Sequence, residues 1–253
     1  MADAHLTALR SSVARLHDLA AGLDEEELTG RAYPSEWSVA DVLSHLGSGA
    51  VITRRRLDDT LTGSETPDDF APVVWDEWNA KPPLAQRNDA LAADASLLAS
   101  LDAVPAEQRS TFTSEMGPMT LDFAQFVAMR LNEHAFHTWD IEVAGNPTAT
   151  IPQQASELIV DNLDLIARFT ATPTGDTTMI TVATTDPARR LLVELTPESV
   201  TFGPSNSDAG EADLRLTAES FARLVYGRLD PAHTPAGDHG PALDVLRQVF
   251  PGP

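Results

Sequence analysis

Two histidines and one glutamate in this sequence have the chemistry and the spacing of a metal site. Glu133 and His137 are four residues apart in the stretch 121–145, which has no proline and no glycine before its last residue. On a helix this spacing places the carboxylate and the imidazole on one face, about 6 Å apart along the axis. His45 belongs to a separate predicted helix, from which its imidazole can reach the pair. Two imidazoles and a carboxylate form an open site with positions left for water or substrate, and zinc is the expected ion, with a softer or redox-active divalent metal as the alternative.

The face of 121–145 that holds these groups is the one expected to be buried. Arg130 and Asp140 share it with Glu133 and His137, in steps of three and four residues. Buried charges are costly unless they are paired or bind an ion. Arg130 can neutralise Glu133, and Asp140 can accept a hydrogen bond from the second ring nitrogen of His137. A structural role for these groups is the alternative, and the histidine on a second inner face favours the metal site.

Four helices are expected to position these groups. The periodicity of apolar residues predicts them over 5–21, from 38 to about 56, over 84–101 and over 121–145. Ser38 is a natural N-cap for the second helix, and Asp41 can complete a capping-box variant. Leu91, Ala95 and Leu98 form the predicted apolar line of the third helix. Short to medium connections favour an antiparallel four-helix bundle.

The segment 62–83 is predicted as a long loop, because it is rich in Gly, Ser, Thr, Asp and Pro. Trp75 and Trp78 within it can line a pocket or cover the end of the bundle. The basic triplet 54–56 is interpreted as a solvated last helical turn. His134 is one residue off the inner face of its helix and is expected at the surface or at a helix–helix seam.

Beyond residue 145 the pattern changes from helices alone to a mixture of helices and strands. One more helix is predicted over 152–169. Short β-branched and leucine-rich segments then predict strands over 178–184, 191–196, 199–202 and 212–217, with helices over 218–228 and 243–250. This change predicts an α+β protein of two domains, a four-helix bundle followed by a small α/β domain, with the boundary near 146–175.

The composition excludes several classes of protein. A formal net charge of −21 over 253 residues argues against nucleic acid and anionic membranes as partners. Without cysteine there is no disulfide framework, no thiolate metal site and no cysteine nucleophile, so a metal must be held by nitrogen and oxygen. No apolar run approaches the roughly 18 residues of a membrane span. No secretory signal is visible, so a cytoplasmic protein is expected. A monomer or homodimer is the expected oligomeric state.

Two motifs, WSVADVLSHL at 37–46 and MRLNEHAFHTWDI at 129–141, resemble the DinB-like superfamily, and specifically the mycothiol-dependent maleylpyruvate isomerase family. The resemblance covers nearly the whole chain. It implies a DinB-like metal-binding bundle over 1–150, a connecting helix and linker over 151–175, and a small sterol-carrier-like domain over 176–253. It also implies that His45, Glu133 and His137 are zinc ligands and that mycothiol is the thiol cosubstrate.

The same resemblance points to further residues for binding substrate or thiol. FARLVYGR at 221–228 is similar to a helix of the C-terminal domain in which family members carry a functional arginine, a place taken here by Arg228 or Arg223. The family's isomerases also place an arginine before the third helix to meet the substrate carboxylates. This chain has DEWNAK at 76–81 instead, which leaves Trp78 and Asn79 as candidates. The departure concerns the substrate, and the implied fold and metal do not depend on it.

These features predict an enzyme in which a divalent metal activates a low-molecular-weight thiol. The thiolate would isomerise a small electrophilic substrate, as in maleylpyruvate isomerase, or be transferred to it. One alternative is a metal-dependent hydrolase with bound water as the nucleophile. The other is a non-catalytic protein whose C-terminal domain holds a small apolar ligand while the bundle serves as a scaffold.

Overall fold

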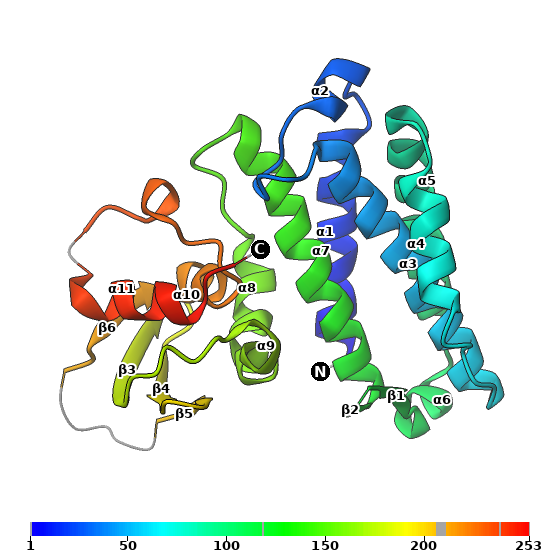
Figure 1. Ribbon diagram of the computed structural model, residues 1–253. Coiled ribbons are helices and arrows are strands. Elements are labelled where there is room, and N and C mark those ends of the chain that lie inside the picture. The colour runs from blue at the N-terminus through cyan, green and yellow to red at the C-terminus, as the bar shows by residue number, and fades with distance from the viewer. Residues whose placement is uncertain (1, 118, 206–210, 238, 253) are drawn as a thin grey trace. The chain divides into compact units, whose positions relative to one another are not determined.

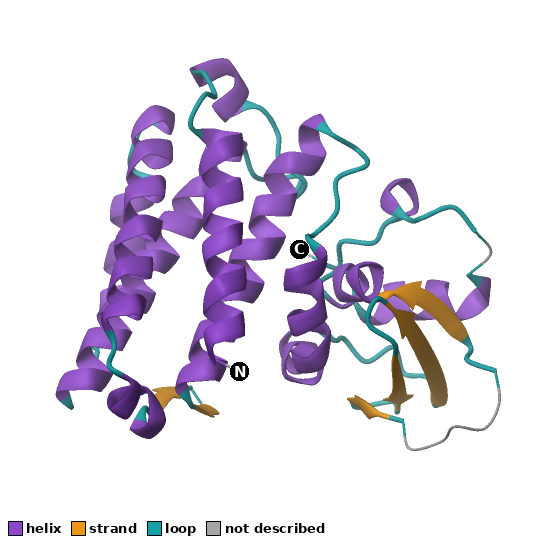
Figure 2. Ribbon diagram, turned by 180° about the vertical axis from the view of Figure 1, so that it is seen from behind, coloured by secondary structure: helices purple, strands orange, loops and turns teal. Residues whose placement is uncertain are grey.

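The computed structural model describes residues 2–117, 119–205, 211–237 and 239–252. It divides into two compact units, Met1–Ala149 and Thr150–Pro253. The first unit is built almost entirely from helices, and the second combines helices with a small sheet (Figures 1 and 2). The predicted α+β class, with a helical N-terminal part and a small sheet-containing C-terminal part, is confirmed.

Four long helices, α1, α3, α5 and α7, form the body of the first unit (Figure 1). The helices of this unit are α1 (Ala2–Ala20), α2 (Glu25–Thr29), α3 (Val39–Thr62), α4 (Phe70–Asn79), α5 (Pro83–Ala103), α6 (Ala106–Thr111) and α7 (Phe123–Gly145). An antiparallel hairpin of β1 (Ser114–Met116) and β2 (Met119–Leu121) precedes α7. Ser38 caps α3 in a reciprocal capping box with Asp41, as the sequence predicts.

The directions of these helices differ from those of an all-antiparallel bundle. α3 and α5 run parallel: Gly47 faces Ala90, and further along both helices Arg54 donates a hydrogen bond to Ser96. α1 and α7 also run parallel, because a hydrogen bond formed later along α1 is also formed later along α7. For α3 and α7 the order is reversed, so these two helices run antiparallel. The bundle therefore pairs parallel and antiparallel neighbours.

The parallel pairing of α3 and α5 is caused by α4, which lies in the segment 62–83 that the sequence predicts as a loop. That prediction is wrong because Pro72 falls in the first turn of α4, where a helix does not need the missing N–H. Val74 and Trp78, four residues apart, are buried on its inner face. α4 returns along α3, and α5 therefore begins near the end of the bundle at which α3 began.

The second unit is a four-stranded sheet with helices. Its elements are α8 (Gln153–Ile159), the 3-10 turn η1 (Val160–Asn162), α9 (Leu163–Thr170), β3 (Thr178–Thr185), β4 (Arg189–Leu195), β5 (Val200–Pro204), β6 (Leu214–Thr217), α10 (Ala218–Val225), η2 (Pro231–His233) and α11 (Gly240–Val249). The strand order is β5-β4-β3-β6, in which only the β3–β6 pair is parallel. Alternate residues such as Ile180 and Val182 on β3 are buried, and Phe202 stacks on Phe221 of α10.

The stretch 151–175, predicted as a connecting helix and linker, folds within this second unit. The single helix predicted over 152–169 is broken by η1 into α8 and α9, which pack against α10. No helix in the described part of the chain has the length and apolar character needed to cross a bilayer.

Candidate metal centre

The structure brings the three predicted ligands together between α3 and α7. Nε2 of His45 lies 3.2 Å from Oε2 of Glu133, and Nε2 of His137 lies 3.7 Å from the same oxygen. Each residue offers one ligand atom, and the three atoms all lie within 4.8 Å of one another. The two helices run in opposite directions, so one histidine from α3 meets the glutamate–histidine pair of α7.

This donor set fits a divalent metal such as zinc. Bonds of about 2.0 to 2.2 Å in tetrahedral geometry place neighbouring ligand atoms roughly 3.4 Å apart. The two measured separations, 3.2 and 3.7 Å, bracket that value. Two imidazoles and one carboxylate leave at least one position open for water or a substrate atom.

Neighbouring side chains hold the two imidazole rings in place. His137 Nδ1 is 2.8 Å from Oδ2 of Asp140, which is fully buried. The backbone carbonyl of Asp140 accepts a hydrogen bond from Tyr33, which further ties this turn of α7 to the bundle. Trp37 packs against both rings, tilted on His45 and stacked on His137. An imidazole whose Nδ1–H donates to a carboxylate presents Nε2 as a lone pair toward a metal, so Asp140 has the position predicted for it.

Glu133 is held in its charged form. Burial opposes ionisation, but hydrogen bonds and charge from His137 and His45 outweigh it and hold the pKa of the Glu133 carboxyl far below its usual range. Its side chain is 45% exposed, whereas that of His137 is 12% exposed. The site is therefore closed on the side of His137 and open beside Glu133.

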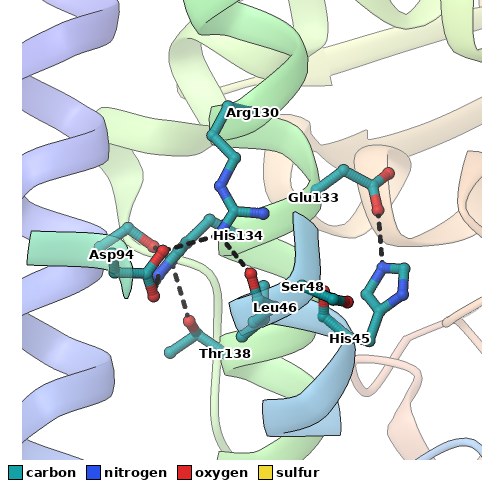
Figure 3. A network of polar contacts seen from close by, with 9 residues as sticks. His45, Leu46, Ser48, Asp94, Arg130, Glu133, His134 and Thr138 are labelled. Carbon is teal, nitrogen blue, oxygen red and sulfur yellow. Dashed lines mark hydrogen bonds and ion pairs between the residues drawn. The ribbon is translucent and has the colours of Figure 1, made fainter. Parts of the chain in front are cut away.

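Arg130 and His134 belong to a buried network behind the site (Figure 3). The sequence suggests that Arg130 neutralises Glu133, but Nη2 of Arg130 donates instead to Asp94 of α5, at 2.7 Å, and to the carbonyl of Leu46, at 2.8 Å. His134 is fully buried, with Nε2 3.1 Å from the other Asp94 oxygen. The prediction that His134 lies at the surface is therefore wrong, and its other predicted place, a seam between helices, stands.

Asp94 was missed because the inner face of α5 is displaced from the predicted one. The buried residues of this helix include Ala90, Asp94, Leu97 and Leu101. The predicted apolar line is shifted by one residue from this buried face and includes Ala95, which is exposed. The spacing of four, three and four residues around Asp94 is the helical signal that could have identified it.

A pocket of about 260 Å³ opens beside the ligands. Its wall includes His45 and Glu133, together with Arg130 and Arg56. Apolar side chains from α3, α4, α7 and the β1–β2 hairpin complete the wall: Ile52, Trp75, Met116, Leu121, Phe126 and Met129. The open side of the site thus faces a space suited to a small molecule.

The sequence matches a known family over the region that builds this site. The profile of the mycothiol maleylpyruvate isomerase N-terminal domain matches residues 9–142, more than half of the 253 residues. The chain belongs to the mycothiol maleylpyruvate isomerase N-terminal domain family. All three candidate ligands lie inside the matched region.

The fold of the mycothiol maleylpyruvate isomerase family extends over most of the chain. The structure is similar to the crystal structure of the mycothiol-dependent maleylpyruvate isomerase, with a TM-score of 0.66 at 16% sequence identity, and the similarity covers 90% of both chains. A histidine-to-alanine mutant of that isomerase gives the same TM-score and coverage at 15% identity. No curated protein sequence matches the chain.

This member of the mycothiol maleylpyruvate isomerase family places Trp78 and Asn79 away from the pocket wall. Trp78 is buried against Gly47 in the bundle core, and Asn79 accepts a hydrogen bond from Ser44. Trp75, one turn earlier on α4, is the tryptophan that lines the pocket. Lys81 stands near the position where the family resemblance leads one to expect an arginine, and its ammonium group pairs with Asp89 and covers the Trp78 ring.

Arg223 and Arg228 belong to the second unit, and both are buried. The Arg223 guanidinium pairs with Glu219 and donates to the carbonyls of Arg228 and His233. Arg228 donates to the carbonyl of Tyr226. These contacts fix the turn after α10, and a role for either arginine in binding substrate or thiol stays a prediction.

Proposed function

We propose that this protein is a zinc-dependent enzyme that uses mycothiol to isomerise, or to add sulfur to, a small electrophilic substrate. The observation that carries the proposal is the convergence of His45, Glu133 and His137 on one point whose open side faces a pocket. Membership of the mycothiol maleylpyruvate isomerase N-terminal domain family supports mycothiol as the thiol. Because the chain has no cysteine, a sulfur nucleophile must come from a cosubstrate.

A divalent ion held by these three side chains would supply the Lewis acidity that favours thiolate over thiol near neutral pH. In isomerisation, the thiolate sulfur forms a bond to one carbon of a conjugated cis double bond. The remaining carbon–carbon single bond rotates, and the carbon–sulfur bond then breaks to release the trans isomer and the thiolate. In transfer, the carbon–sulfur bond is kept and the adjacent carbon takes up a proton.

The residues of the chain orient and shield this chemistry. Asp140 holds the His137 ring so that Nε2 faces Glu133, and Trp37 covers the two imidazoles. The apolar wall of the pocket limits water around the reacting atoms, which strengthens electrostatic interactions there.

The test combines metal analysis with an assay for maleylpyruvate isomerisation in the presence and absence of mycothiol. We expect one zinc ion per chain and turnover that depends on mycothiol. His137→Ala should lose the bound metal and the activity, because it removes one of three ligands. His17→Ala is the matched control, since His17 is exposed on α1 and outside the site.

Full metal occupancy in His137→Ala, with the fold intact by circular dichroism, would refute the ligand assignment. Turnover without mycothiol would replace the thiol mechanism with hydrolysis by bound water. A wild-type protein that is free of metal after purification without chelator would refute the metal-dependent enzyme and favour a non-catalytic binding protein.

A further inference from the structure

A second pocket adjoins the one beside the candidate metal ligands. It has a volume of about 650 Å³ and is lined by the last turns of α3, the segment that follows α3, and the β1–β2 hairpin. Figure 1 shows this hairpin at the end of the bundle where α3 ends. Ile52, Arg56 and Met116 line both pockets. The two pockets are therefore adjacent, and a ligand that extends past these three side chains would occupy both.

The pocket beside the candidate ligands is small for the proposed reaction. Its volume of about 260 Å³ is below the roughly 300 to 1,000 Å³ of pockets that enclose a drug-sized ligand. Mycothiol alone is of that size, because it joins an acetylated cysteine to a glucosamine ring and an inositol ring. Most of the thiol must therefore lie outside this pocket when its sulfur reaches the metal.

The second pocket is polar, whereas the first is largely apolar. Serine, threonine and acidic residues supply most of its lining side chains, among them Thr60, Thr113, Ser114, Glu65 and Asp68. Glu65 and Asp68 are exposed, and neither has a hydrogen-bond or ion-pair partner in the described parts of the chain. Carboxylates with free oxygens accept hydrogen bonds from the neighbouring hydroxyl groups of a sugar-like ring. The wall is therefore suited to a polyhydroxylated group.

Arg56 supplies hydrogen-bond donors where the two pockets meet. The triplet 54–56 is predicted as a solvated last helical turn, but α3 continues to Thr62 and Arg56 is half-buried, so the prediction is wrong for Arg56. Among the described residues its guanidinium has no hydrogen-bond or ion-pair partner, whereas both preceding arginines form ion pairs. This guanidinium and the unpaired carboxylates together offer the donors and acceptors that hydroxyl groups need.

The distance along α3 suits a thiol that spans both pockets. Ile52 lines both of them and follows His45 by seven residues, a rise of about 10 Å. In extended mycothiol five bonds separate the sulfur from the glucosamine ring, about 6 Å with standard bond lengths, and the rings extend further. A thiol with its sulfur at the metal can therefore place its rings beside Ile52 and Arg56, in the polar pocket.

We propose that the polar pocket binds the polyhydroxylated rings of the thiol cosubstrate, and that its carboxylates discriminate against thiols that carry negative charge. Glu65 and Asp68 accept hydrogen bonds from the ring hydroxyls, and Arg56 donates to them. The same two carboxylates repel the carboxylates of an anionic thiol such as glutathione. The inference rests on the proposed function in taking a thiol bound at the metal as the ligand.

The test is calorimetric titration of the full-length protein, with its zinc content measured, by four probes. Mycothiol has the thiol and both rings, N-acetylcysteine amide has the thiol alone, N-acetylglucosaminyl-inositol has the rings alone, and glutathione is an anionic thiol. We expect mycothiol to bind at least about tenfold more tightly than N-acetylcysteine amide, because only mycothiol uses both pockets. Glutathione should bind more weakly than N-acetylcysteine amide, and the rings alone should bind with or without zinc.

Two variants alter the polar pocket in different ways. Glu65→Ala combined with Asp68→Ala removes the two unpaired carboxylates, and Thr113→Trp fills the pocket without altering its charge. Each variant should weaken the binding of mycothiol and of the rings alone about tenfold and leave the binding of N-acetylcysteine amide unchanged. The carboxylate variant should also bind glutathione more tightly than wild type does. Glu25→Ala combined with Glu26→Ala is the matched control, because it makes the same change in net charge at exposed residues of α2.

Mycothiol binding that is unchanged in both variants, with both folded by circular dichroism, would overturn the site for the rings. Glutathione binding as tight as mycothiol binding would overturn the discrimination by charge. A protein that binds no zinc, yet binds the rings alone and loses that binding in the variants, would refute the proposed function and keep this inference. Zinc binding and mycothiol-dependent turnover, with mycothiol affinity unaffected by either variant, would keep the proposed function and refute this inference.

Discussion

One carboxylate, that of Asp94, holds both Arg130 and His134 inside the bundle. One oxygen accepts from Arg130 and the other lies 3.1 Å from Nε2 of His134, whose Nδ1 lies 2.8 Å from the Ser12 hydroxyl. Removing one partner of a buried charged pair costs far more than a surface ion pair contributes, because the other charge is left without compensation. The position of the pocket's guanidinium therefore depends on a residue of α5 that does not line the pocket.

We predict that Asp94→Asn lowers the free energy of unfolding by roughly 3 to 5 kcal/mol at pH 7. The variant should also show a pH dependence that identifies the cause. Burial alone would raise the pKa of Asp94, but the charges of His134 and Arg130 and their hydrogen bonds outweigh burial and hold the pKa below its usual range. The folded protein therefore binds this proton less readily than the unfolded chain. Stability from Asp94 is complete above about pH 4 and is lost as the pH falls further.

Urea unfolding of wild type and Asp94→Asn between pH 7 and pH 3 measures this effect. The difference in the free energy of unfolding between the two proteins should be constant down to about pH 4 and should shrink below that pH. Asp18→Asn, at an exposed aspartate beside His17, is the matched control and should differ little from wild type at any pH. A difference that stays constant to pH 3 would contradict the assignment of the charged pair.

The three candidate ligands could be predicted from the sequence because two of them lie four residues apart on one helix. The partner of Arg130 could not be predicted in this way, since Asp94 comes from a different helix and a search for apolar residues passes over it. Local spacing thus identifies groups that share a helix, whereas contacts between helices require knowledge of how the helices pair.

At the scale of elements, α4 decides how the bundle is assembled. It returns along α3 and allows α5 to run parallel to α3, and Trp78 fixes it by packing over Gly47. A Cβ at position 47 would lie 2.1 Å from the Trp78 ring and 2.9 Å from the Cα of Ala90. Glycine is required here by close approach of a side chain and a neighbouring helix.

We predict that Gly47→Ala lowers the free energy of unfolding by about 1 to 3 kcal/mol, as expected when a packed core must accept an extra methyl group. Gly145→Ala, also in a helix but with open space around its Cβ, should leave the stability nearly unchanged. Chemical denaturation followed by tryptophan fluorescence measures both, since Trp78 reports on the contact directly. Equal stability of the two variants would show that α4 shifts to accept the methyl group at position 47 with no loss of free energy of unfolding.

The start of α3 could be predicted because its signal is local: Ser38 and Asp41 satisfy each other's backbone groups. α7 begins at Phe123 through a similar capping box of Asp122 and Gln125, two residues after the predicted start. α4 could not be predicted, because the polar and glycine-containing residues before it and Pro72 within it are typical of a loop. The parallel pairing of α3 with α5 follows from α4 and was missed with it.

At the scale of the whole molecule, the three candidate ligands all lie in the first unit. The ligands come from α3 and α7, and the residues that orient them, Asp140 and Trp37, also precede residue 150. This unit has a hydrophobic core of its own, built from residues such as Leu43, Leu46 and Trp78. The first unit thus holds every candidate ligand together with a hydrophobic core of its own.

We predict that a chain ending at Ala149 binds one zinc ion with an affinity within about threefold of the full-length protein, because the three candidate ligands, Asp140 and Trp37 are all kept. Metal analysis and competition with a chromogenic chelator measure stoichiometry and affinity. His137→Ala in the shortened chain is the negative control and should bind no zinc. A shortened chain that stays helical by circular dichroism yet loses zinc would show that residues 150–253 contribute to the metal centre, and the three-ligand assignment would then be incomplete.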